Sequence, residues 1–530
     1  MNAHTADMEI GSSPVLARNR ASGEPMGQFR ATDPSQIPEL VAQTASVQPL
    51  WALLRVTDRA RYMRRVAQAI IDEFSELVGV LAAEQGRPRS ELATLELLPA
   101  IDALIWMADA GAEIMGAKRI PVHRSMFLTK RGRVAYEPLG VIGVIGSDSA
   151  PFAEPLGQIA AALLAGNGVI FKPAPETAAT AERIARLLAR AGLPEGLVVL
   201  AHGGAPVGQA LAQAPVDKLL FTGSARVGRE IAQTCVSENR ALELALEGSD
   251  AMLLAPDAHL PRAASCAVWA GFAAAGGARG SIERIYAHRD VAERFTELLL
   301  QRTRGLRVGD PLDWHTQVGP LPSASDRLRL QELIQDALAR GARLDCGGPV
   351  APPDGLTGSF FAPAVLSGVT HEMRVMREPI NGPLLALMSV ESMSAAIALA
   401  NECECGLGAS VWTADRHQAL RMACELKTGM VWLNDHLPTP MIAQAPWGAG
   451  EARTFGEAGL RACAREKLIT WDPSGSRGLW WGPHSQTLAR AAQSVAELRS
   501  ARDAHREHAW RRGGLALARV GIRALRHRGG

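Results

Sequence analysis

Residues 269–286, WAGFAAAGGARGSIERIY, combine small residues with one charge in a way that suggests a site of chemistry. The Ala and Gly residues at 273–278 leave little side chain between the backbone and an approaching ligand. Arg279 follows this run directly. Its guanidinium stays protonated at physiological pH and has no acceptor lone pair, so it can hold a carboxylate in a bidentate fork but cannot act as a nucleophile or a base. The spacing therefore predicts a ligand-contacting turn with an unreactive centre.

A second group of candidates suits a phosphate or a sugar. Gly223, Ser224 and Gly228 follow the apolar run 218–221, and such a turn can bring a helix N-terminus near a pyrophosphate. Lys172 ends the apolar run before it, at the sheet edge where open α/β sheets bind ligands, so its ammonium could reach a ribose or a phosphate. Taken singly, turn glycines and a surface lysine are the simpler interpretation.

The cysteines predict neither disulfides nor a metal site. Seven of them are scattered through the chain, an odd number that fits reduced thiols. Cys403 and Cys405 are the one close pair, and two ligands without a second pair are a weak metal signal, so we expect no metal. Cys266 lies 13 residues before Arg279 and is expected to be a small core residue.

Composition indicates an ordinary globular protein. The 530 residues are 47% hydrophobic and 21% charged, which is enough for two or three domains with sizeable cores. A net charge of +2 argues against binding of the whole protein to nucleic acid. The N-terminus shows no secretory signal and no run reaches the roughly 18 apolar residues of a membrane span, so we expect a cytoplasmic protein.

The elements that must position the candidates alternate between helices and strands. Apolar spacing predicts two helices between residues 49 and 81, another over 97–105 and an exposed strand over 131–136. The fully apolar segment 140–145 predicts a strand covered on both faces. It is followed by helices at 154–165, 177–192 and 206–213 and by strands at 169–172, 197–200 and 218–221.

These repeated units predict right-handed crossovers and a doubly wound α/β sheet. A break at 247–250 precedes a second set of strands and helices, and we place the change of domain there. That set includes a strand over 251–255 and helices over 291–304 and 323–340.

Four segments in order resemble the motifs of a known family. They are LGVIGVI at 139–145, FKPAPET at 171–177, FTGSARVG at 221–228 and EPINGP at 378–383. From about residue 45 to 472 the chain resembles the NAD(P)-dependent aldehyde dehydrogenase superfamily. The resemblance implies a Rossmann-like cofactor domain, a second α/β domain of the catalytic type and a small oligomerisation element of strands.

The resemblance also implies a cofactor and its binding residues. These are Lys172, Glu176, Gly223, Ser224, Gly228 and Glu378, with Glu378 on the nicotinamide ribose. Glu176 suits a ribose without a 2′-phosphate, so we expect NAD, with NADP as the alternative. The predicted domains begin with a mobile N-terminal arm (1–45), followed by an NAD(P)-binding domain (46–130 and 138–247) and a catalytic-type domain (248–445). The bridging and oligomerisation segments are 131–137 and 446–474, and a basic extension covers 475–530.

Other residue types stand at the family's catalytic positions. Alignment on the flanking motifs puts Ser149 at the oxyanion-binding asparagine, Ala245 at the catalytic glutamate and Arg279 at the cysteine. Ala245 and Arg279 are 34 residues apart, as the family's glutamate and cysteine are. A slip of two residues could bring Glu243 or Glu247 to the place of the base, but it supplies no thiol. The segment 446–456 also resembles the family's glycine-rich loop but is about four residues short.

These departures predict a family member that is catalytically impaired and acts as a cofactor- or metabolite-binding subunit. The expected small-molecule ligand is an aldehyde or a carboxylate. Arg279 with Ser149 could form a small anion-binding pocket for a carboxylate, whereas a guanidinium turned toward solvent or toward Asp148 is the alternative. The alternative function is an active oxidoreductase on aldehydes or related carbonyl compounds that uses other residues. The resemblance implies a homodimer or tetramer, and an impaired subunit suggests a mixed assembly with a catalytic paralogue.

The C-terminal extension is strongly basic. Residues 475–530 hold 11 Arg and three acidic residues. At helical spacing, an apolar stripe (Leu515, Ala518, Ile522 and Leu525) lies beside a basic one (Arg519, Arg523 and Arg526). Such a helix could lie weakly on an anionic membrane surface or on a partner, and a solvated tail weakened by Gly513 and Gly514 is the alternative.

Overall fold

A computed structural model of the chain describes residues 14–122, 129–403, 406–448, 454–473, 480–481 and 484–526. The described residues form two compact units. The first comes from Met1–Ile114 and Pro138–Arg465, and the second from Met115–Glu137 and Glu466–Gly530. Each is described by itself.

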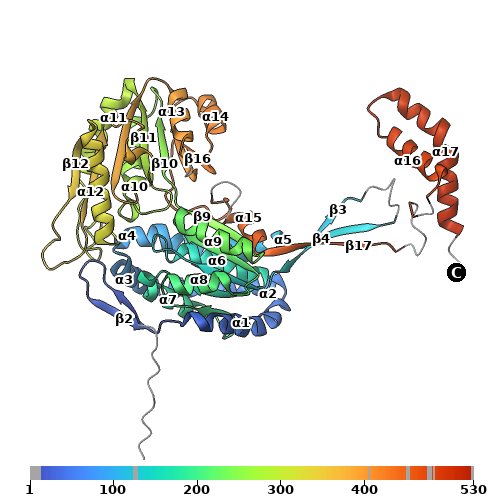
Figure 1. Ribbon diagram of the computed structural model, residues 1–530, viewed down its shortest axis with the longest axis horizontal. Helices are drawn as coiled ribbons and strands as arrows, with labels where there is room; N and C mark the ends of the chain where they lie inside the picture. The colour runs from blue at the N-terminus through green and yellow to red at the C-terminus, as the bar shows by residue number, and fades with distance from the viewer. Residues whose placement is uncertain are drawn as a thin grey trace, which may run out of the picture. The chain divides into compact units, whose positions relative to one another are not determined.

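The first unit contains a five-stranded parallel sheet, which confirms the doubly wound prediction (Figure 1). Its strands run in the order β7 (Val198–Leu200), β6 (Gly168–Lys172), β5 (Val141–Ile145), β8 (Lys218–Gly223) and β9 (Ala241–Leu246). All five residues of β5 are buried, because helices cover both faces of the sheet. The chain order reverses beside β5, and this is where open α/β sheets bind ligands.

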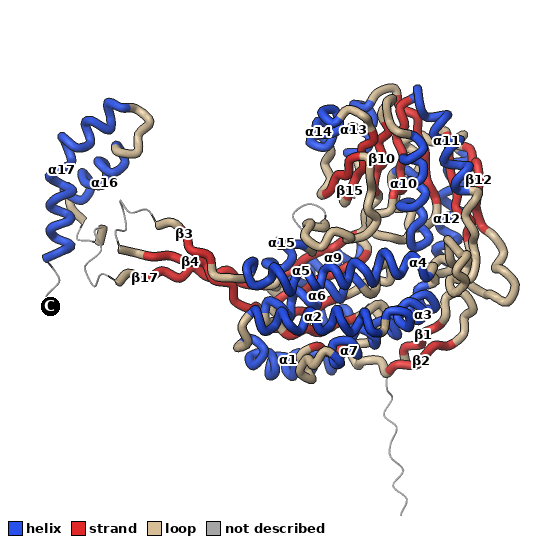
Figure 2. The backbone as a smooth tube through the Cα atoms, turned by 180° about the vertical axis from the view of Figure 1, so that it is seen from behind, coloured by secondary structure: helices blue, strands red, loops and turns tan. Residues whose placement is uncertain are grey.

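The helices on the two faces belong to different chain segments. One face packs against α1 (Ile37–Ala52), α8 (Ala205–Gln213) and α9 (Ala225–Ser237), which share a core with it. The other packs against α6 (Ala153–Ala165) and α7 (Ala178–Arg190). Outside these lie α2 (Val56–Asp72), α3 (Phe74–Gln85) and α5 (Leu98–Ile114), with α4 (Arg89–Leu92) and the π-helical turn η2 (Ala93–Leu97) between α3 and α5 (Figure 2).

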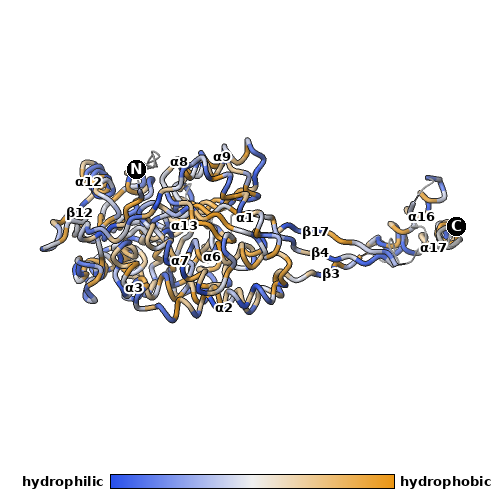
Figure 3. Tube along the Cα trace, turned by 90° about the horizontal axis from the view of Figure 1, so that it is seen from below, coloured by the Kyte–Doolittle hydropathy of each residue, from blue (hydrophilic) through white to orange (hydrophobic). Residues whose placement is uncertain are grey.

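A seven-stranded sheet begins at Asp250, just after the break where the sequence suggested a change of domain. Its order is β12 (Arg343–Pro349), β13 (Phe361–Ser367), β14 (Leu384–Val390), β11 (Ile282–His288), β10 (Asp250–Leu254), β15 (Gly408–Trp412) and β16 (Met430–Leu433), with only β12 antiparallel to its neighbour among these strands. On one face lie α10 (Leu260–Phe272) and α11 (Arg289–Thr303), and on the other α12 (Ala324–Ala339), α13 (Met393–Asn401) and α14 (Arg416–Glu425). Figure 3 shows hydrophobic stretches gathered inside the first unit around α6.

The prediction of a mobile arm over residues 1–45 is wrong for residues 14–45. A hairpin of β1 (Val15–Arg18) and β2 (Pro25–Phe29) is followed by the start of α1. The hairpin is held because Ala17 and Ala21 are buried and the backbone N–H of Arg20 donates to the carbonyl of Ala83 at 2.8 Å. The sequence did not predict this packing because the hairpin consists largely of small and polar residues and has no periodic apolar pattern. Residues 1–13 lie outside the described residues.

Three strands form a separate sheet in the order β17 (Ala464–Trp471), β4 (Arg131–Pro138) and β3 (Lys118–Ile120). β17 and β4 belong to the two segments, 446–474 and 131–137, that the sequence assigned to bridging and oligomerisation, and they pair with each other within the chain (Figure 1). The side of β17 away from β4 is a sheet edge. Leu468 and Trp471 of this strand are exposed.

The C-terminal extension forms two packed helices, α16 (Gln486–Glu497) and α17 (Asp503–Arg526). α17 continues through Gly513, and a Cβ there would lie 1.4 Å from Oγ of Ser494, so glycine permits the close packing of the two helices. The buried stripe of α17 includes Ala516 and Val520. Of the apolar stripe suggested by the sequence, Leu515 and Ile522 are exposed. No described helix is both long and apolar enough to cross a membrane.

Candidate functional site

A cavity of about 510 Å³ lies at the carboxyl ends of β5, β6 and β8. Lys172, Glu176, Gly223 and Ser224 line it, so four of the six residues that the resemblance suggested for a cofactor meet in one place. Lys172 is buried, and burial lowers the pKa of its ammonium to about 8, while Glu176 opposes this shift. Gly208 also lines the cavity, and a side chain there would approach Cε of Lys172 to 3.9 Å.

The N-terminus of α9 faces this cavity. Ser224 is its N-cap, with Oγ accepting the backbone N–H of Val227 at 3.4 Å, so other first-turn amides remain available for an anion. Gly228 lines neither this cavity nor the next one. A Cβ on Gly228 would lie 2.6 Å from Cδ2 of Leu246, so this glycine lets α9 pack closely on β9.

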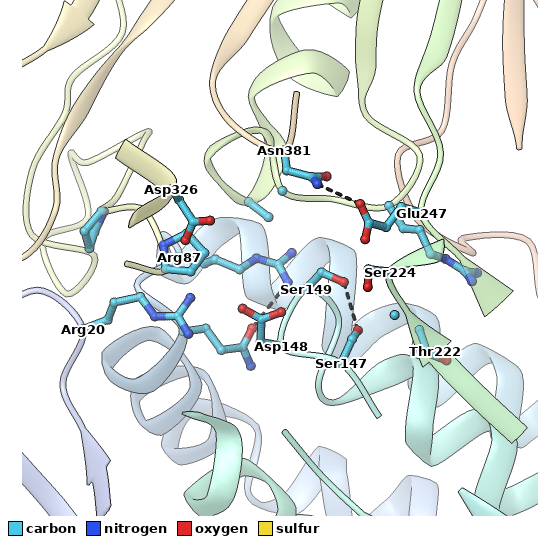
Figure 4. A pocket seen from close by; sticks show the side chains of 17 residues that line it. Arg20, Arg87, Ser147, Asp148, Ser149, Thr222, Ser224, Glu247, Asp326 and Asn381 are labelled. Carbon is cyan, nitrogen blue, oxygen red and sulfur yellow. Dashed lines mark hydrogen bonds between the residues drawn. The ribbon is translucent and has the colours of Figure 1, made fainter. Parts of the chain in front are cut away.

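A second cavity of about 260 Å³ adjoins the first and shares five lining residues with it (Figure 4). Of the 17 residues that line it, 12 have charged or polar side chains. It is lined by three arginines (Arg20, Arg87 and Arg279), three acids (Asp148, Glu247 and Asp326), two amides (Gln85 and Asn381) and four hydroxyls (Ser147, Ser149, Thr222 and Ser224).

The turn before Arg279 is built from backbone contacts. In the 3-10 turn η4 (Ala273–Gly276), Ala274 and Ala275 have φ of 53° and 51°, a left-handed conformation that non-glycine residues rarely adopt. A Cβ on Gly276 would lie 2.0 Å from the carbonyl oxygen of Gly382, so only glycine fits there. The small residues thus allow close contact with the neighbouring chain segment.

Arg279 forms an ion pair with Glu154. Its Nη2 lies 3.0 Å from Oε1 of Glu154, and both side chains are almost fully buried, at 5% and 2% exposure. The two partners considered from sequence, solvent and Asp148, are therefore wrong. Burial raises the pKa of Glu154 above its usual range, while Arg279 opposes the rise. Thr222 is within 3.5 Å of the same carboxylate oxygen.

The other positions matched to the family's catalytic residues hold no reactive pair. Oγ of Ser149 lies 3.0 Å from Oγ of Ser147. Ala245 is buried on β9 and lines neither cavity. Of the two acids beside it, Glu243 accepts from Nζ of Lys218 at 2.8 Å and lies away from both cavities, whereas Glu247 lines the second one.

Glu247 is oriented by a neighbour that sequence analysis did not single out. Its Oε2 accepts from Nδ2 of Asn381 at 2.8 Å, and Asn381 adopts a left-handed φ of 47°. Glu378, expected on the cofactor ribose, lines neither cavity. Its two carboxylate oxygens accept from Nε and Nη2 of Arg374 at 2.7 and 3.1 Å, which lowers the pKa of Glu378.

No cysteine among the described residues lines either cavity. Cys266 lies on α10, and burial raises the pKa of its thiol to about 12, so it is an unreactive thiol. Cys235, Cys346, Cys424 and Cys463 are free thiols. No group of three His, Cys, Asp or Glu within the described residues could hold a metal ion, and Cys405 and residues 449–453 of the short loop over 446–456 lie outside them.

Arg87 is the main residue of the site that the sequence did not suggest. Its Nε lies 2.6 Å from Glu91 and its Nη1 2.6 Å from Glu96; Arg87 and Glu96 are almost fully buried, and Glu91 is 13% exposed. Burial alone would lower the pKa of Arg87, but the two carboxylates raise it above its usual value. Glu91 also accepts the backbone N–H of Ala274 at 2.8 Å, so this triad holds the turn before Arg279.

One sequence signal could have found these charges. Glu96 and Glu154 stand inside apolar helical segments, and an acid in a buried segment requires a partner. Arg20 was hidden for a different reason, since it lies in the polar turn between β1 and β2. Burial lowers the pKa of Arg20, while Asp148, Glu176, Glu84 and Asp326 oppose the shift.

Comparison with known proteins gives consistent relatives. The model of the "Aldehyde dehydrogenase family" matches residues 10–467. A betaine aldehyde dehydrogenase of Cereibacter sphaeroides is 32% identical over 462 residues, covering 86% of this chain and 93% of that protein.

Solved structures show the same similarity. An aldehyde dehydrogenase of Mycobacterium tuberculosis in complex with NAD+ is 30% identical with a TM-score of 0.81, covering 86% of this chain and 94% of that one. An NADP-dependent enzyme of E. coli is 29% identical with a TM-score of 0.82, covering 87% and 95%. The family match stops at residue 467, so α16 and α17 lie outside it.

Proposed function

The chain belongs to the aldehyde dehydrogenase family, and we propose that it binds a nicotinamide dinucleotide without performing the family's oxidation of aldehydes. Its role is then that of a cofactor- or metabolite-binding subunit. The observation that carries the proposal is the buried ion pair between Arg279 and Glu154, at the position that alignment on the flanking motifs assigns to the family's nucleophilic thiol.

The residues of the larger cavity fit a dinucleotide. Lys172 supplies an ammonium, and the N-terminus of α9 supplies amides for a pyrophosphate. Gly208 and Gly223 line the cavity without side chains that would fill it. Glu176 would repel a 2′-phosphate and accept hydrogen bonds from ribose hydroxyls, so we propose NAD rather than NADP. When bound, the nicotinamide would supply the capacity to accept a hydride.

The smaller cavity does not fit the family's chemistry. Acyl transfer to a thiol needs a thiolate and a base, and a guanidinium provides neither. Loss of a nucleophile from a coupled catalytic set lowers turnover by about six orders of magnitude. Glu247 remains a carboxylate near the site, but it has no thiol to act with among the described lining residues.

The test is a titration of NAD+ and NADP+ into the full-length protein, followed by absorbance of the reduced cofactor with a panel of aldehydes. We expect saturable binding, tighter for NAD+, and no aldehyde-dependent reduction. Glu176→Gln should narrow the preference for NAD+, and Glu195→Gln, a change of a glutamate outside both cavities, should leave it unchanged. Aldehyde-dependent reduction that is lost in Glu247→Gln would instead support an active oxidoreductase.

We also propose that the edge of β17 pairs with a second subunit, either another copy or a catalytic paralogue. A sheet edge with exposed Leu468 and Trp471 offers unpaired backbone groups and apolar side chains. Light scattering after size-exclusion chromatography should give a dimer or tetramer for the wild type and a monomer for Leu468→Pro. The control Leu328→Gln, an exposed leucine on α12, should leave the assembly unchanged. A monomeric wild type with no co-purified partner would contradict this assignment.

We propose that α17 makes weak contact with anionic membrane surfaces. Leu515 and Ile522 are exposed on the same helix as exposed Arg511 and Arg519, a pattern that suits an anionic interface. The full-length protein should sediment with phosphatidylglycerol vesicles but not with phosphatidylcholine vesicles. Leu515→Gln with Ile522→Gln should abolish this, and Leu50→Gln, an exposed leucine on α1, should not. Equal binding to both lipids would refute the proposal.

A further inference from the structure

Buried N–H donors without a hydrogen-bond acceptor belong to three residues that line the smaller cavity. Within the described part of the chain, Nε2 of Gln85, Nη2 of Arg87 and all three guanidinium nitrogens of Arg279 have no acceptor of hydrogen-bond geometry, although Nη2 of Arg279 lies 3.0 Å from Oε1 of Glu154. These residues are 2%, 4% and 9% exposed. A buried donor without an acceptor is costly, and native proteins usually satisfy it with protein, water or ligand oxygen atoms.

Neighbouring contacts fix the direction of these donors. Oε1 of Gln85 accepts from Nη1 of Arg87 at 3.4 Å, which leaves the amide Nε2 of Gln85 facing away from that contact. Nε and Nη1 of Arg87 are held by Glu91 and Glu96, so Nη2 alone remains. Protein contacts therefore hold the side chains of Gln85 and Arg87 while one donor of each stays unused, and a carboxylate is an acceptor that can take several N–H bonds at once.

The remainder of the wall favours positive charge. Arg20 lies in the field of four carboxylates, of which Asp148 and Asp326 also line the cavity, and Figure 4 shows these three residues around Arg87. Arg87 pairs with two glutamates and Arg279 with one, so these two arginines offer hydrogen bonds without excess positive charge. A simple anion would meet surplus acid on the Asp148 and Asp326 side, whereas an ammonium group would be stabilised there.

We propose that the smaller cavity binds a small zwitterion, with its carboxylate on the donors of Gln85, Arg87 and Arg279 and its ammonium beside Asp148 and Asp326. A volume of about 260 Å³ admits a molecule the size of a short amino acid. The inference rests on the proposed function in one respect, since it treats the site as a binding site rather than a reaction site. It replaces the simpler pocket of Arg279 and Ser149, because Ser149 hydrogen-bonds Ser147 and Arg279 is shared with Glu154.

Isothermal titration of the full-length protein without cofactor tests the proposal. The probes are the zwitterions 4-aminobutanoate and glycine betaine. Butanoate, which has only the carboxylate, and butylamine, which has only the ammonium group, are the single-charge comparisons. We expect at least one zwitterion to bind at least tenfold more tightly than either single-charge compound, because both ends contribute charged hydrogen bonds or ion contacts. Since no dinucleotide is present, failure here is separate from failure of cofactor binding.

Two variants distinguish the two ends of the cavity. Asp326→Asn should weaken the zwitterion and butylamine about tenfold and leave butanoate unchanged. Gln85→Met, which keeps the side-chain length, should weaken the zwitterion and butanoate and leave butylamine unchanged. Glu297→Gln, a change on the exposed face of α11, is the matched control and should have no effect. No binding of either zwitterion, equal binding of butanoate, or wild-type affinities in both variants would overturn the proposal.

Discussion

Removal of the Arg279 side chain should expose how strongly the site depends on its ion pair. In Arg279→Met the carboxylate of Glu154, at 2% exposure, loses the guanidinium 3.0 Å away. Breaking a buried pair on one side costs about 3 to 5 kcal/mol, because the remaining charge stays desolvated. We therefore expect the free energy of unfolding in urea to fall by about this amount near neutral pH.

The loss should depend on pH in a defined direction. Burial already raises the pKa of Glu154 above its ordinary value of 4.5, and Arg279 opposes that rise, so its removal should raise the pKa further. A carboxyl with a raised pKa in the folded state binds its proton more tightly there than in the unfolded chain. The contribution of this tighter proton binding to the free energy of unfolding is complete below pH 4.5 and is lost as the pH rises through the folded-state pKa. The deficit of the variant should therefore grow as pH increases above 4.5.

Two further variants complete the test. Arg279→Met with Glu154→Gln removes the unpaired charge and should recover most of the loss, which gives a coupling energy above about 1 kcal/mol in the double-mutant cycle. Arg226→Met breaks the exposed pair with Glu230 on α9 and should change stability by less than about 1 kcal/mol. A loss below about 1 kcal/mol in Arg279→Met that does not vary with pH would refute the reasoning.

Three other perturbations have defined outcomes. Lys172 has a pKa of about 8, and an anionic cofactor favours its charged form, so the Kd for NAD+ should rise about tenfold from pH 7 to pH 9 in the wild type and stay constant in Lys172→Gln. Gly513→Ala should separate α16 from α17 and speed their cleavage by trypsin, while Gly521→Ala, which has no atom within 4 Å of its new Cβ, should not. Gly276→Ala should destabilise the protein by more than about 1 kcal/mol in urea unfolding, since its Cβ would lie 2.0 Å from the Gly382 carbonyl.

The sequence predicted the regular part of the fold because burial on both faces leaves a periodic record. The apolar segment 140–145 is β5, and the helix expected over 154–165 is α6, shifted by one residue at its start. Chain segments without a periodic apolar pattern were missed because nothing in their sequence records burial. Arg20 lies in a polar turn that packs through two alanines, and nothing in its neighbours signals that it reaches a cavity.

The candidate site was predicted in its parts but not in its contacts. Motif order was enough to group Lys172 with Gly223 and Ser224, because Lys172 and Gly223 are the last residues of two strands of one parallel sheet. The partner of Arg279 could not be predicted, since Glu154 comes from a distant helix and only packing of the two domains brings the charges together. Glu378 was misplaced because a helical-spacing partner, Arg374, binds its carboxylate.

The central claim is that the chain retains the dinucleotide cavity while Arg279 stands where the family's reaction needs a thiol. The most direct test is one experiment with full-length protein saturated with NAD+, in which binding is measured by calorimetry and reduced cofactor by absorbance after addition of aldehydes. Saturable binding without aldehyde-dependent reduction is the predicted result. Sustained reduction of the cofactor at a rate above the uncatalysed reaction would contradict the claim.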